Sequence, residues 1–409
     1  MGGLQLVSIL VQFLEDSSVL KEITPQAARE CLRQACALFP VSKLLLGWNI
    51  PRTLFDAVAE EASQLSVMLY RWQPLLTGDG TIFTPLEWQV VGVNGESVPG
   101  FRGLPEFTFM CPSKPAVQEA VSRRLRDISI YPYQGVFLDR IRFPSPTGQP
   151  FLHLACFCED CCRVAKEVDH LDLAELRKIL CAFFQTAEAA SFLSASLLGN
   201  YPPELPSEIA EGLQCFFRFR MKSISNFVRL AAETASARGM EIGLDCFSPS
   251  LTGMVGQDLP SLSQVSDWIK VMTYAHAWGP AGLAYEFMGL TAFLCQKTGM
   301  SKADALSFLR KQSQLGLPGS IQELRTRGLP SSALALEVER GRTLGLHPLY
   351  AGLELVEIVG VCELSPGKIR RDWSAVLEAG IEGVVLSWDL WHMPLDRLRL
   401  VSDILVKYS

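Results

Sequence analysis

The sequence predicts an α/β fold: a closed (β/α)8 TIM barrel with helical insertions and an N-terminal helical extension. Short β-rich runs alternate with longer helical patterns along the 409 residues, and eight such runs can be counted. Eight strand-plus-helix units is the number that closes a barrel of this type. Runs that are apolar on both faces also favour a parallel sheet covered by helices. An open doubly wound sheet is the alternative, but it more often has a Gly-rich phosphate-binding turn after its first strand, whereas "GWNIP" follows the first run here.

The predicted strands lie, in chain order, at 43–49, 65–72, 106–111, 135–143, 240–247, 267–275, 349–356 and 383–390. The first is followed by the helical pattern "RTLFDAVAEEASQ", and the third by "KPAVQEAVSRRLRDI", which has Pro in its first turn. Residues 1–41 are expected to form the N-terminal helical extension and residues 42–409 the barrel domain. Enlarged helical insertions are expected at about 160–239 and 281–345.

Composition argues against several classes of partner. The net charge is −6 and no Lys/Arg-rich run occurs, so neither nucleic acid nor an anionic membrane surface is expected as a partner. No apolar run reaches the roughly 18 residues of a membrane span, and the N-terminus lacks the basic region of a signal peptide. Twelve cysteines without a secretion signal favour a reducing compartment, so a cytoplasmic location is expected.

Aromatic, acidic and basic residues recur at the predicted strand ends. The reactive face of such a barrel lies at the carboxyl ends of its strands. This mixture suits a sugar ring, because aromatic side chains stack on its C–H face while charged groups bond its hydroxyls. The predicted substrate-binding residues are Trp48, Arg71, Trp72, Arg140, Arg142, Lys270, Tyr274, His276, Trp388 and Asp389.

Three acidic residues are candidates for glycosidic bond cleavage, which uses two carboxyl groups. They are Asp139, Asp245 and Glu354. Strand alternation places Asp139 on the opposite face from Arg140, so a simple ion pair within the strand is unfavourable. Asp139 is therefore expected to be one catalytic group, with Glu354 or Asp245 as the other. Asp389 is a weaker candidate, because an aspartate at a strand end is often a helix N-cap.

Two segments resemble known proteins. "GVFLDRIRFPSP" (135–146) is similar to the fourth-strand motif of a family of glycosyl hydrolase barrels defined mostly by sequence, in which D-x-[IL]-R-[FY]-P closes the strand. The segment 242–280 resembles the region from their fifth to their sixth strand. The resemblance implies a glycan-processing barrel whose pocket is lined by Asp139, Asp245, Tyr274 and His276. Relatives often have proline after the tyrosine, where this chain has Ala275 in "MTYAH".

The stretch "ACFCEDCC" contains a C-x-C-x-x-C arrangement. Three thiolates this close can share a tetrahedral zinc ion, which needs a fourth ligand. The element is similar to the zinc loop of the family 42 β-galactosidases, where a single cysteine also lies upstream. That resemblance implies a structural zinc ion held by Cys111, Cys156, Cys158 and Cys161. The alternatives are free thiols, or ligand sets in which Cys162 replaces Cys161, or His153 or His170 replaces Cys111.

These observations predict a glycoside hydrolase that acts on an unidentified oligo- or polysaccharide, with no cofactor for catalysis. One alternative is a non-catalytic carbohydrate-binding barrel that has kept the pocket. A third reading is a metal-dependent hydrolase at the cysteine cluster, which would need an open coordination position.

Overall fold

The computed structural model describes residues 7–15, 20–79, 84–186 and 188–408. Eight parallel strands close into one barrel in chain order, each pairing with the next and β8 pairing with β1. The strands are β1 (Ser8–Phe13), β2 (Val41–Leu46), β3 (Met68–Pro74), β4 (Gly135–Asp139), β5 (Glu241–Phe247), β6 (Trp268–Met272), β7 (Leu349–Glu354) and β8 (Gly383–Ser387). The predicted (β/α)8 barrel is confirmed.

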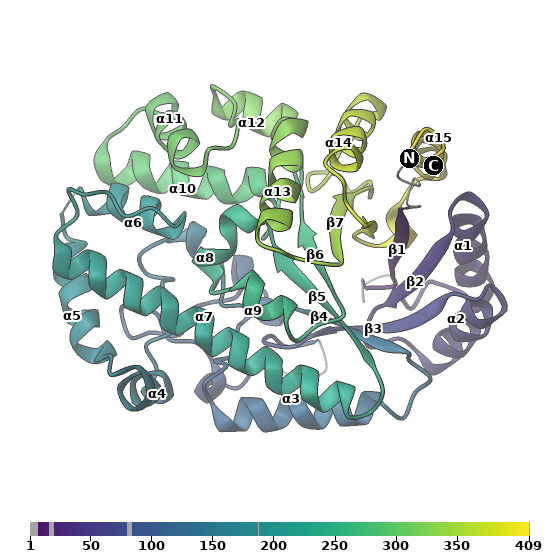
Figure 1. Ribbon diagram of the computed structural model, residues 1–409, viewed down its shortest axis with the longest axis horizontal. Helices are drawn as coiled ribbons and strands as arrows, with labels where there is room; N and C mark the ends of the chain where they lie inside the picture. Colours follow the sequence, from purple (N-terminus) through teal and green to yellow (C-terminus); the bar gives the residue numbers. More distant parts are fainter. Residues whose placement is uncertain (1–6, 16–19, 80–83, 187, 409) are drawn as a thin grey trace.

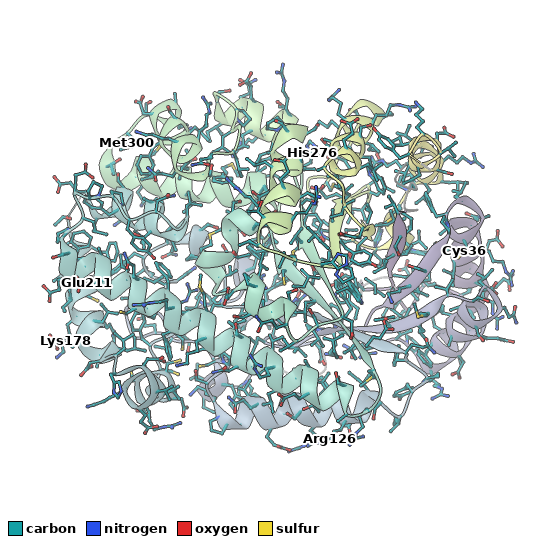
Figure 2. All side chains as sticks on the ribbon, viewed as in Figure 1. Cys36, Arg126, Lys178, Glu211, His276 and Met300 are labelled. Carbon is teal, nitrogen blue, oxygen red and sulfur yellow. The ribbon has the colours of Figure 1, made fainter. Side chains whose placement is uncertain are left out.

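Helices surround the strands (Figure 1). They are α1 (Pro25–Leu38), α2 (Arg52–Gln64), α3 (Pro115–Ile128), α4 (Glu159–Asp169), α5 (Leu173–Phe183), α6 (Ala189–Leu197), α7 (Ser207–Ser236), α8 (Thr252–Val255), α9 (Leu259–Ser263), α10 (Leu283–Thr298), α11 (Lys302–Ser313), α12 (Ile321–Arg327), α13 (Ser331–Thr343), α14 (Pro366–Glu378) and α15 (Leu395–Leu405). Charged side chains lie on the outer helices, as Figure 2 shows for Arg126 on α3, Lys178 on α5 and Glu211 on α7.

Strand alternation divides the core into two parts. Side chains that point outward from the strands pack under the helices in one large apolar cluster. Those that point inward form a smaller cluster of Leu10, Leu45, Trp48, Tyr70, Trp72, Phe137, Trp268, Tyr350 and Val385. The inner cluster fills much of the barrel interior. Polar groups lie at its two ends: Lys43 bonds Tyr70 and Glu241 at the amino-terminal end of the strands, and a larger polar set lies towards their carboxyl ends.

Two predicted elements are wrong. The expected helical extension at 1–41 instead contains β1 and α1, and β1 lies between β2 and β8 in the barrel. The segment 106–111 is not a barrel strand; Phe109 and Met110 form only isolated antiparallel bridges, to Thr77 and Gln89. The physical reason is that a short apolar run such as "SILVQF" cannot be distinguished from a buried helix by periodicity alone.

The long crossovers carry most of the additional helices. Between β4 and β5 the chain forms α4 to α7, and between β6 and β7 it forms α10 to α13. These helices lie together on one side of the barrel in Figure 1. Among the described residues, no helix is both long enough and apolar enough to cross a membrane.

Candidate functional site

Three buried carboxyl groups lie at the carboxyl end of the barrel. Asp139 is the last residue of β4, Asp245 lies near the end of β5, and Glu354 is the last residue of β7. Their exposed fractions are 8%, 3% and 4%. Buried acidic groups need hydrogen-bond or charge partners, or a functional reason to be buried.

Asp139 accepts hydrogen bonds from two N–H groups. The indole Nε1 of Trp72 donates to Asp139 Oδ2 at 3.1 Å, and the backbone N–H of Arg140 donates to Oδ1. Trp72 is itself held edge-on by Trp48, with ring centroids 5.5 Å apart. Three predicted residues are therefore brought together: Trp48 just after β2, Trp72 on β3 and Asp139 on β4.

Lys270 connects the polar groups inside the barrel. Its Nζ donates to Asp245 Oδ2 at 3.2 Å, to Gln12 Oε1 at 3.2 Å and to the Tyr274 hydroxyl at 2.7 Å. Glycine at position 352 of the neighbouring strand β7 leaves room for the lysine, since a Cβ there would lie 2.3 Å from Lys270 Cε. The lysine is fully buried, and its contacts fix it in the interior of the barrel.

Burial dominates the electrostatics of Asp245. It raises the pKa of Asp245 to about 7, with the nearby charge of Asp139 adding to the rise and Lys270 opposing it. Asp245 Oδ1 has no hydrogen-bond partner among the residues that the structure describes. Burial also raises the pKa of Tyr274 well above its usual value, so its hydroxyl stays protonated. Asp245 is thus a carboxyl group able to hold or release a proton near neutral pH.

Glu354 is held by the loop that follows β6. Its Oε1 accepts from the backbone N–H groups of His276 at 2.8 Å and Ala277 at 3.0 Å. Burial raises the pKa of Glu354. The imidazole of His276 instead bonds Asp372 on α14, with Nε2 2.7 Å from Oδ2, in the upper part of Figure 2. His276 therefore contacts Glu354 through its main chain, and its ring packs between α14 and Gly328.

The arginines that follow β4 hold the loops around the site. Arg140 donates to Thr77 Oγ1 at 3.0 Å and to the Glu106 carbonyl at 2.8 Å, so it fixes the loop after β3. Arg142 lies between the rings of Phe109 and Phe247, each 4.6 Å from the guanidinium carbon. Burial lowers the pKa of Arg142 to about 10, opposed first by Asp139.

Two predicted binding residues have other positions. Arg71 alternates with Tyr70 and Trp72 on β3, so its side chain lies outside the barrel, in a groove with Phe55 and Tyr131. Asp389 accepts hydrogen bonds from the backbone N–H groups of Leu14, Glu15 and Trp391. Asp389 is therefore a backbone cap, as the alternative interpretation of the sequence allowed. Trp388 stays near the predicted site, edge-on to Tyr274 with centroids 5.6 Å apart.

Two polar residues of the barrel interior, Gln12 and Ser387, are not among the predicted site residues. Gln12 on β1 accepts from Lys270 and also from the Ser387 hydroxyl of β8, at 2.7 Å. Gln12 Nε2 has no partner among the described residues. The signal was present, because Gln12 is the one strongly polar side chain in the run "ILVQF". Gln12 was not a candidate because residues 1–41 were expected to be a helical extension outside the barrel.

The four cysteines Cys111, Cys156, Cys158 and Cys161 form a buried cluster. Their sulfur atoms all lie within 4.8 Å of one another. The Sγ of Cys111 is 3.4 Å from that of Cys161 and 3.6 Å from that of Cys158. Zn–S bonds of about 2.3 Å in a tetrahedron imply S···S distances of about 3.8 Å, so the four positions could hold a metal ion. Four cysteine ligands would fill the tetrahedron.

The chain was compared with known proteins. The sequence matches no protein-family model, and no curated protein matches it. The fold resembles the PgaB (BpsB) glycoside hydrolase domain from Bordetella bronchiseptica, with a TM-score of 0.57 and 14% identity over 98% of this chain and 99% of that one. It also resembles a β-galactosidase from the haloarchaeon Halorubrum lacusprofundi, with a TM-score of 0.57 and 12% identity over 98% of this chain and 58% of that chain.

A third similar structure is the β-galactosidase of the psychrophilic Marinomonas ef1, with a TM-score of 0.54 and 11% identity over 97% of this chain. The chain spans 59% of that enzyme's length, and so less than two thirds of either β-galactosidase. At these identities the likeness establishes a shared (β/α)8 barrel fold. The likeness does not bear on the cysteine loop, whose resemblance to family 42 stays a prediction.

Proposed function

We propose that this protein is a glycoside hydrolase-like enzyme that cleaves glycosidic bonds of an oligo- or polysaccharide at the carboxyl end of its barrel. The observation that carries the proposal is the set of three buried carboxyl groups at the ends of β4, β5 and β7. Glycosidic cleavage needs two such groups, one to give a proton and one to act as nucleophile or base. The shared fold of the similar structures supports the same reaction class.

Asp139 and Asp245 are the pair that the electrostatics favour. The charge of Asp139 acts on Asp245, whereas the charges that act on Glu354 come from His276 and Asp372. A carboxyl group with a pKa of about 7 suits the general acid, so Asp245 takes that role. Asp139, which accepts two N–H donors, acts as the nucleophile or base. Glu354 then positions the loop of His276 and Ala277.

Aromatic side chains and Lys270 supply the binding surface in this proposal. Trp48, Trp72 and Trp388 offer faces or edges against which a sugar ring can pack. Lys270 and Tyr274 offer donors at the level of Asp245. The substrate class is therefore a carbohydrate, and neither nucleic acid nor membrane is part of the proposal.

The test is release of reducing ends from a broad panel of oligo- and polysaccharides. Wild type should release sugar, and Asp139→Asn should lose about 10²–10⁴-fold of the rate, because a positioned proton-transfer or nucleophilic group contributes on this order. Asp403→Asn, an exposed change of the same kind on α15, is the matched control and should keep full activity.

A fully active and folded Asp139→Asn variant would overturn the assignment. If no protein releases sugar while saccharides still raise the melting temperature of wild type and Asp139→Asn alike, the barrel binds carbohydrate without cleaving it. That is the second function that the sequence allows.

We further propose that the cysteine cluster holds a structural zinc ion. The four buried sulfur atoms match the spacing of a tetrahedral site and leave no open position. The ion would brace the loop before α4 against the segment before α3, which supplies Cys111. Metal-dependent hydrolysis at this cluster has no open coordination position to use.

A further inference from the structure

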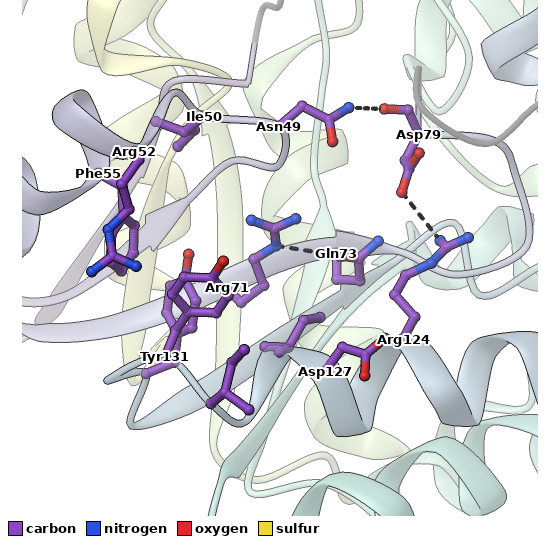
Figure 3. Close-up of a pocket in the computed structure, with 13 residues that line it drawn as sticks. Asn49, Ile50, Arg52, Phe55, Arg71, Gln73, Asp79, Arg124, Asp127 and Tyr131 are labelled. Atoms are coloured by element: carbon purple, nitrogen blue, oxygen red, sulfur yellow. Dashed lines mark hydrogen bonds and ion pairs between the residues drawn. The ribbon is translucent and has the colours of Figure 1, made fainter.

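The helix ring leaves a polar groove on the outer side of β3 (Figure 3). In this part of the barrel α2 packs against α1, and α3 packs against α7. Side chains of both α2 and α3 line a space of about 410 Å³ between them. This groove lies outside the barrel, so it is separate from the carboxyl groups of the interior and does not depend on the proposed function.

The floor of the groove is polar where a barrel strand is normally apolar. Outward positions on β3 alternate through Leu69, Arg71 and Gln73, and Leu69 packs in the apolar layer under the helices. Arg71 donates through Nε to Gln73 Oε1 at 3.2 Å and has a long contact of 3.5 Å with the Gly47 carbonyl. No carboxylate pairs with Arg71 among the described residues.

A second guanidinium faces the same space. Arg124 of α3 donates to the Pro74 carbonyl at 3.1 Å and lies 3.6 Å from Asp79. Burial lowers the pKa of Arg124; Asp79 opposes this shift and the like charge of Arg71 adds to it. On the floor of the groove, two arginines that repel each other are accompanied by one carboxylate, Asp79 beside Arg124, which leaves about one unbalanced positive charge there. Asp127 also lines the groove, but it is exposed at the rim, where solvent screens its charge. An anion in the groove would remove the repulsion.

The rim of the groove is aromatic and apolar. Phe55 lies edge-on to Tyr131, with centroids 5.4 Å apart, and near Tyr133 at 5.5 Å. Ile130 is 80% exposed and Tyr131 is 39% exposed, although both are large apolar residues. An exposed apolar rim beside an unpaired cation fits a ligand with both an acidic group and an apolar body.

We propose that this groove binds a small organic carboxylate. Its acidic group pairs with Arg71 and Arg124, and its apolar body lies against Tyr131 and Ile130. One carboxylate neutralises the single unbalanced charge of the floor. An inorganic phosphate dianion would exceed that charge.

The experiment is calorimetric titration of the full chain with phenylacetate, the neutral analogue 2-phenylethanol and inorganic phosphate. Phenylacetate should bind, and the alcohol should bind at least about tenfold more weakly, because it lacks a charge-assisted hydrogen bond, which contributes on this scale. Phosphate should also bind more weakly, because it has no apolar body to contact Tyr131 and Ile130 and its charge exceeds that of the floor. Arg71→Gln should weaken phenylacetate binding about tenfold or more. Arg123→Gln, on the same helix as Arg124 but 69% exposed, removes the same charge and should bind as wild type does.

Ile130→Ser provides a second variant that leaves the fold untouched, since this side chain is already exposed. It should weaken phenylacetate and leave the binding of acetate unchanged. Equal binding by wild type and a folded Arg71→Gln variant would overturn the proposal. So would binding of phosphate in preference to phenylacetate, or the absence of any phenylacetate binding to wild type.

Discussion

At the scale of single residues, Asp245 links the site to the stability of the protein. Its pKa is raised from 3.8 to about 7, so the folded chain keeps a proton that the unfolded chain releases above pH 4. The stabilising contribution of this group is therefore present at low pH and lost as pH rises through about 7. Asp245→Asn has no such titration. We expect the stability of wild type relative to Asp245→Asn to fall, by an amount on the order of a few kcal/mol, between about pH 4.5 and 7.5.

Denaturant unfolding of both proteins at the two pH values measures this difference without any knowledge of the substrate. Asp403→Asn is again the control, because it is the same substitution at an exposed position far from the barrel interior. An unchanged difference for Asp245→Asn would mean that its pKa in the folded state is ordinary, and the assignment of Asp245 as general acid would fail with it.

At the scale of elements, the cysteine cluster joins the segment before α3 to the segment before α4, and both segments have little regular structure. Cys111 precedes α3, whereas Cys156 and Cys158 precede α4. Among the described residues, hydrogen bonds between the two segments include that from the Val91 N–H to Cys156 Sγ at 3.3 Å. The segments are also joined by a hydrogen bond from the Phe157 N–H to the Val91 carbonyl and by the ion pair of Lys114 with Asp160, and a bound metal ion would add to this connection.

We expect the purified protein to contain one zinc ion per chain and to melt several degrees lower after chelation, because a ligand that binds only the folded state stabilises it. Cys156→Ser should lose both the metal and this stability. Cys162→Ser should keep both, since Cys162 lies outside the cluster although it is adjacent in sequence. Elemental analysis and thermal melts measure these effects, and retention of zinc by Cys156→Ser would contradict the ligand set.

The strands predicted correctly are those whose sequence patterns are distinctive. The strands that contain Asp139 and Asp245 have apolar runs with charges near one end, and the structure confirms them as β4 and β5. β1 was not predicted because a run of five consecutive buried residues has neither helix nor strand periodicity. The β-rich composition of 106–111 predicts a strand, and only the tertiary pairing shows that this segment belongs to a loop.

At the scale of the whole molecule, the sequence predicted the closed barrel but not which strands meet at closure. The error at β1 removed Gln12 from the candidate site, because its neighbours Ser387 and Lys270 come from β8 and β6. Strand alternation predicted that the Asp139 side chain points into the barrel. The outward direction of the Arg71 side chain was not predicted, because an arginine can lie there only where helix packing leaves a gap between α2 and α3.

Asp389 also supports closure of the barrel, because it joins the ends of β8 and β1. Its carboxylate follows β8 and accepts from the backbone N–H groups of Leu14 and Glu15 at the exit of β1, each at 2.9 Å. Asp389→Ala would leave buried N–H groups without these acceptors and should reduce stability by about 2–4 kcal/mol. If Asp389 only caps the backbone, saccharide binding by the folded variant should match wild type. A variant that is as stable as wild type but binds saccharide more weakly would return Asp389 to the substrate site.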